Sequence, residues 1–89
     1  MEYLDFDNCY KHYIEFLYVC KEKLKEVIVP NKMADFMWHS HMQEHAAYKK
    51  DCEMMVGKML NHVDEYNEQE LAGYWKNTQK YKKKLLPAN

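Results

Sequence analysis

Residues that break helices are scarce in this chain of 89 amino acids, which contains two glycines and two prolines. A β-sandwich needs turn residues at frequent intervals, so their scarcity favours long helices. Long apolar runs are also missing, because no window approaches the roughly eighteen residues of a transmembrane helix. We therefore expect an all-α protein without a membrane partner.

A signal peptide and a disulfide framework are not expected either. The acidic start, Met1–Asp7, lacks the basic region and the apolar run of a signal peptide. The three cysteines are odd in number and unevenly spaced, which is not typical of a disulfide-stabilised fold. Both observations favour an intracellular, cytoplasmic location, where thiols stay reduced.

Arginine is absent, since all thirteen basic residues are lysine. Lysine lacks the planar guanidinium that binds phosphate or guanine through two parallel hydrogen bonds. The formal net charge of −1 gives no overall attraction to nucleic acid or to an anionic surface. Lysines and aromatic residues do alternate over residues 75–84, but a solvated helix face explains that pattern better than a nucleic-acid interface. We do not expect nucleic acid as a partner.

Hydrophobic residues make up 47% of the chain and aromatic residues 15%, which predicts a folded core. The length suffices for one modest core and not for a second domain. We therefore expect a small single-domain bundle of about four helices that occupies residues 1–89.

Apolar residues recur at steps of three and four along most of the chain, the spacing of one helical face. Residues 27–30 interrupt this pattern, because β-branched residues before a proline favour an extended path. Gly57 suits a left-handed helix end. The four expected helices cover about residues 8–26, 31–42, 44–56 and 67–85.

Polar residues that can cap a helix stand before three of these segments. Asp7 or Asn8 can begin the first helix, and Asn31 the second. The pattern Asn67-Glu-Gln-Glu70 resembles a capping box for the fourth. We expect the fourth helix to bury one face, made of Leu71, Tyr74, Trp75, Thr78, Tyr81 and Leu85.

The richest segment chemically is Asp35-Phe-Met-Trp-His-Ser-His-Met42, followed by Tyr48, Asp51-Cys52, Gly57 and His62. With Pro30 before it, this order resembles the glycine-rich-domain-containing protein-like family, a domain of unknown function. The family block reads approximately Pro-Ser, Val-Asp, x-x-Trp-His-x-His, then Tyr, Cys, Gly and His.

The resemblance covers about residues 28–82. Asn31 stands where the family has serine, Ala34 stands where it has valine, and the glycine-rich segment is missing. The resemblance implies a compact helical unit and no assigned catalytic activity.

Our leading hypothesis is a non-enzymatic structural or protein-interaction module with a buried polar–aromatic cluster. Seven methionines and eight tyrosines exceed what so small a core can hide, so we expect a protein partner or self-association. Beside the histidines and the cysteine of the motif, the structural cluster consists of Asp35, Trp38, Tyr48 and Gly57.

The alternative hypothesis is a transition-metal site for zinc, copper or iron, with an enzymatic role left open, because imidazole and thiolate are ligands that these metals prefer. Two residues apart on a regular helix, His39 and His41 point about 200° away from each other, so both bind one ion only if the helix unwinds near Met42. His41 and His45 could chelate instead if the helix continues. The candidate ligands are His39, His41, Cys52 and His62.

Nucleophilic catalysis needs a thiol, a base and an orienting carboxylate, and Cys52 lies close in sequence to such residues. However, nothing marks an oxyanion hole, and Cys52 falls on the apolar stripe of its helix, where cysteine behaves as a small hydrophobe. We therefore expect no catalytic residue, and no cofactor beyond the candidate metal ion.

Overall fold

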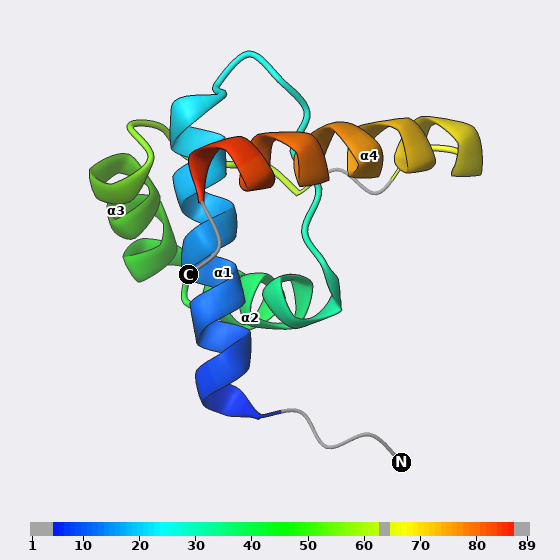
Figure 1. The fold of residues 1–89 in the computed structure, drawn as a ribbon. Coiled ribbons are helices and arrows are strands. Elements are labelled where there is room, and N and C mark those ends of the chain that lie inside the picture. Colours follow the sequence, from blue (N-terminus) through cyan, green and yellow to red (C-terminus); the bar gives the residue numbers. More distant parts are fainter. Residues whose placement is uncertain (1–4, 63–64, 87–89) are drawn as a thin grey trace.

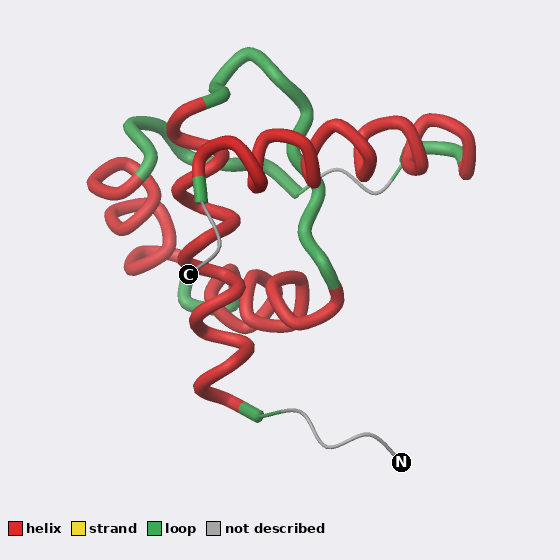
Figure 2. Tube along the Cα trace, in the orientation of Figure 1, coloured by secondary structure: helices red, strands yellow, loops and turns green. Residues whose placement is uncertain are grey.

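A computed structural model describes residues 5–62 and 65–86. In these residues the chain forms helices joined by loops, with no strand (Figures 1 and 2). The all-α class expected from the sequence is thus confirmed. The four helices are α1 (Phe6–Glu22), α2 (Lys32–Met42), α3 (His45–Met55) and α4 (Glu68–Leu85).

Side-chain hydrogen bonds to the backbone explain where α1, α2 and α4 begin. Asn31 caps α2 as predicted, because its side chain accepts from the Ala34 N–H at 2.8 Å. Asn67 and Glu70 form both bonds of the predicted capping box at the start of α4. The cap of α1 was predicted wrongly. Asp5, not Asp7 or Asn8, holds that position and accepts from the Asp7 N–H at 3.0 Å, so α1 begins earlier than expected.

The end of α3 requires a glycine. Gly57 has φ = +100°, a backbone conformation that costs other residues free energy because of their Cβ atom. The chain therefore turns sharply after Val56, as the sequence predicted, and residues 57–62 lead away from α3.

α1 is the central helix and packs against each of the other three. In Figure 1, α2 crosses its lower part and α4 its upper part, while α3 lies to one side. Trp38 packs against Phe16 with ring centroids 4.8 Å apart, which joins α2 to α1. The main cluster of buried side chains consists of Cys9, Tyr13, Phe16, Leu17, Cys20, Ala34, Met37, Trp38, Tyr48, Cys52 and Val56.

α4 is buried less than the sequence predicted. Of the six residues expected on its inner face, Thr78 is fully buried, whereas Leu71 and Trp75 are 46% and 40% exposed. The reason is visible in Figure 1, where the C-terminal half of α4 crosses α1 and the N-terminal half extends beyond it. The predicted periodicity was right, but only part of that face has a helix to pack against.

Hydrogen bonds join α4 to the segment that connects α1 and α2. The Val29 N–H donates to Thr78 Oγ1 at 3.0 Å in a buried position, which satisfies a backbone group that has no helix or sheet partner. Close by, the Tyr81 hydroxyl donates to the Glu26 carboxylate at 2.9 Å.

None of the helices in residues 5–62 and 65–86 combines the length and apolar character that crossing a bilayer demands.

Candidate metal centre

Asp35 and His39 lie one turn apart on the same face of α2, the spacing at which helical side chains meet. His39 Nε2 is 3.4 Å from Asp35 Oδ2. The carboxylate also lies in the first turn of α2, where the partial positive charge of the helix terminus favours an anion. Local helix geometry therefore supplies two potential metal ligands.

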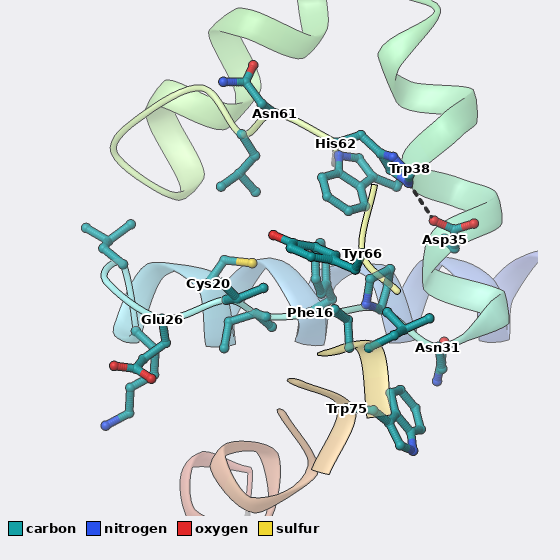
Figure 3. Close-up of a pocket in the computed structure, with 18 of the residues that line it drawn as sticks. Phe16, Cys20, Glu26, Asn31, Asp35, Trp38, Asn61, His62, Tyr66 and Trp75 are labelled. Carbon is teal, nitrogen blue, oxygen red and sulfur yellow. Dashed lines mark hydrogen bonds and ion pairs between the residues drawn. The ribbon is translucent and has the colours of Figure 1, made fainter. Parts of the chain in front are cut away.

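A third potential ligand comes from the segment after Gly57. His62 Nε2 is 3.0 Å from Asp35 Oδ1, although 27 positions separate the two residues in sequence (Figure 3). The His62 ring packs between two others, with its centroid 4.5 Å from that of His39 and 4.6 Å from that of Trp38. Each oxygen of the Asp35 carboxylate thus faces one imidazole nitrogen.

Buried hydrogen bonds fix the backbone that carries His62. Trp38 Nε1 donates to the Tyr48 hydroxyl at 2.8 Å, and this hydroxyl donates to the Leu60 carbonyl at 2.5 Å. The bonds connect α2, α3 and the segment 57–62. Because Leu60 precedes His62 by two residues, the hydrogen bond from Tyr48 helps to position this candidate ligand.

His41 lies in a separate network. Its Nε2 is 2.9 Å from Asp51 Oδ2, and its Nδ1 is 2.8 Å from the Tyr13 hydroxyl. An ionised carboxylate only accepts, so Nε2 carries the hydrogen, and Tyr13 donates to Nδ1 when the ring is neutral. Burial, followed by the nearby Tyr48, raises the pKa of Tyr13 well above its usual range, which keeps this donor protonated.

Cys52 is buried in the core on α3, where it behaves as a small apolar residue. Its neighbour Cys20 is also buried, and burial raises the pKa of the Cys20 thiol to about 12. Cys52 is not part of the group of ligand atoms that the structure brings together.

Of the four ligands predicted from the sequence, the structure brings two together, His39 and His62. It adds Asp35, which we predicted as part of the structural cluster. The signal for Asp35 was present, because Asp35 and His39 stand four residues apart in a predicted helix. α2 stays helical through Met42, so His39 and His41 point to different sides, and a bend at residues 43–44 separates His41 from the helix of His45.

The three side chains suit a divalent metal ion. Their ligand atoms lie within 4.8 Å of one another. In a tetrahedral zinc site with bonds of about 2 Å, ligand atoms are roughly 3.4 Å apart. His39 Nε2 and His62 Nε2 lie 3.4 Å and 3.0 Å from different oxygens of Asp35, so the carboxylate is close to both imidazoles, and the exposed His39 side chain has room to adjust. Two imidazoles and a carboxylate are also the ligands of metal sites that keep coordination positions open.

A groove with a volume of about 560 Å³ begins beside this cluster. Asp35 and His62 form part of its wall, together with Trp38 (Figure 3). Tyr66, Leu71 and Trp75 contribute to the lining, so the exposed half of the apolar face of α4 borders the groove.

Comparisons with models of protein families, with curated proteins and with solved structures found no match to this chain. The resemblance to the glycine-rich-domain-containing protein-like family therefore stays a prediction, and the function has to be argued from the geometry.

Proposed function

We propose that this protein binds one divalent transition-metal ion, with zinc as the first candidate, through Asp35, His39 and His62. The observation that carries the proposal is the convergence of these side chains from two separate segments on a common point. The proposal keeps two ligands of the sequence-based set and replaces His41 and Cys52 with Asp35.

The Asp35 carboxylate contacts the imidazole nitrogens that would bind the metal ion. Both imidazole nitrogens lie within reach of the carboxylate, which can accept a hydrogen from each. A metal ion needs the lone pair of each of these nitrogens, so a neutral imidazole binds it with its hydrogen on Nδ1, and a protonated imidazole must first lose a proton. We therefore expect metal affinity to fall as the pH is lowered.

The experiment is elemental analysis of tag-free protein together with calorimetric zinc titration. We expect about one zinc per chain, and stabilisation by roughly 2.7 kcal/mol when free zinc exceeds the dissociation constant about a hundredfold. His62→Ala should abolish this binding. The matched control is His45→Ala, because His45 is exposed on α3 and does not belong to the cluster.

Cys52→Ala distinguishes the two ligand sets. Zinc binding that survives this change supports the set with Asp35, and zinc binding that is lost supports the set with the thiolate. Less than about a tenth of an equivalent of metal, with no change in stability after zinc is added, would contradict both sets.

A second candidate function is the non-enzymatic protein-interaction module, acting through a partner or self-association in a reducing, intracellular compartment. The half-exposed Leu71 and Trp75 favour it, because apolar surface on one side of a helix is typical of interfaces. The three cysteines are free thiols, as a reducing compartment requires. Sedimentation of the purified chain tests self-association, and a monomer at all concentrations would count against it.

A further inference from the structure

We infer that the groove beside the candidate metal centre binds an elongated apolar molecule with a carboxylate at one end, and that this carboxylate coordinates the metal ion. The inference rests on the proposed function and adds a class of ligand to it.

The size and lining of the groove suit a small apolar molecule. Its volume of about 560 Å³ lies in the range of roughly 300–1,000 Å³ that small-molecule sites occupy. Side chains from α1, α2, α4, the α1–α2 connection and the α3–α4 connection line it (Figure 3). The apolar lining includes Phe16, Ile28, Trp38, Leu60, Leu71 and Trp75.

The metal centre lies at the wall of this groove. Asp35 and His62 line it, whereas His39 does not. A metal ion held by these three residues therefore has the groove on one side. Three protein ligands leave at least one coordination position for another molecule. We place the carboxylate end of the ligand at that position, because Asp35 and His62 both line the groove.

Charge favours an anionic group on the ligand. Lys23, Lys32 and Lys58 line the groove, and the carboxylates there are Asp35 and Glu26. Both carboxylates already have polar partners: Asp35 forms a hydrogen bond with His62 and lies 3.4 Å from His39, and Glu26 accepts from a tyrosine. Lys32 stands one helical turn before Asp35, so it adds positive charge near the metal. A carboxylate satisfies both the lysine and the metal ion, for which oxygen is a suitable ligand.

The test uses decanoate as the probe and the fluorescence of Trp38 and Trp75 as the signal. These are the two tryptophans of the chain, and both line the groove. We expect saturable binding to zinc-loaded protein freed of excess metal, and affinity lower by about tenfold or more for zinc-free protein, a factor that corresponds to 1.4 kcal/mol. Decan-1-ol has the same chain without the carboxylate, and its affinity should not depend on zinc.

Two exposed residues provide matched variants. Leu71→Glu places a negative charge in the wall of the groove and should weaken decanoate binding while the zinc content stays the same. Met54→Glu makes the same kind of change at a residue that is 72% exposed on α3 and does not line the groove, so it should leave binding unchanged.

The outcomes separate this inference from the proposed function. Three results would overturn the inference alone. Zinc-loaded protein does not bind decanoate, the protein binds decanoate equally well with and without zinc, or a dimer forms through the groove and excludes decanoate. Protein that takes up no zinc would overturn the proposed function and the inference together.

Discussion

Replacing Tyr48 with phenylalanine removes one oxygen atom that two other groups share. The hydroxyl accepts from Trp38 Nε1 and donates to the Leu60 carbonyl, and Tyr48 and Trp38 are 1% and 6% exposed. Phenylalanine fills nearly the same volume but leaves both groups without this partner. Each lost partner costs roughly 1–3 kcal/mol, and because the half-buried Leu60 can regain water, we expect a total near 2–4 kcal/mol.

This loss is large beside the stability of a domain of this length, which is roughly 4–13 kcal/mol. Urea unfolding followed by circular dichroism measures it, with an unchanged slope showing that the unfolding reaction is the same. Tyr10→Phe is the control, because Tyr10 is 53% exposed on α1, and its change should stay within about 0.5 kcal/mol.

A double-mutant cycle with Trp38→Phe tests the reasoning further. The Trp38→Phe variant already lacks the indole N–H donor. In that variant Tyr48→Phe should therefore lower the free energy of unfolding by less than it does in the original protein, with a coupling energy of about 1 kcal/mol. Tyr48→Phe should also weaken zinc binding, since it frees the backbone two residues before His62. A loss below about 0.5 kcal/mol, or no coupling with Trp38, would refute the role of this hydroxyl.

Three further perturbations test the core. Trp38→Ala removes a buried ring and should cost roughly 3–5 kcal/mol in a urea melt, whereas a change near zero would exclude Trp38 from the core. Burial raises the pKa values of Cys20 and Tyr13 above their ordinary 9.0 and 10.0, so the folded state holds these protons more tightly than the unfolded state. The stabilisation from these two protonated groups is complete below pH values near 9.0 and 10.0 and is lost as the pH rises. The urea concentration at the midpoint of unfolding should therefore decrease as the pH is raised from about 8 to about 11. A midpoint that stays constant over this range would contradict the assignment. Thr78→Val leaves the buried Val29 N–H without an acceptor and should cost about 1–3 kcal/mol in the same melt, while Thr78→Ser should be milder.

The features of the fold that could be predicted from the sequence, the helix caps and the turn at Gly57, depend on residues that are close together in the chain. The caps at Asn31 and Asn67 need a backbone N–H three residues away, and Gly57 needs only its own φ angle. The extent of burial was less predictable, because it depends on where another helix lies. α4 has the expected apolar face, yet Leu71 remains half-exposed where α1 no longer covers it.

The candidate site shows the same division. The i, i+4 spacing of Asp35 and His39 follows from a helix that the sequence predicts. The contact between His62 and Asp35 could not be predicted from a local pattern, because it depends on the hydrogen bond between Tyr48 and Leu60, which are twelve residues apart in sequence. From the sequence we therefore chose the candidate ligands among histidines and cysteine, whereas the fold brings a carboxylate next to two imidazoles.

The hydrogen bond between Val29 and Thr78 attaches α4 to the rest of the protein at one point, about which the helix could rotate. Thr78 is the buried residue of this helix, and the part that borders the groove lies on one side of it. Leu71 is seven residues from Thr78, or roughly 10 Å along the helix axis. A rotation of about 10° around that point would therefore displace Leu71 by roughly 2 Å. Such a rotation would change the width of the groove, because Leu71 lies in its wall, whereas Asp35 and His39 belong to α2 and would not move with α4.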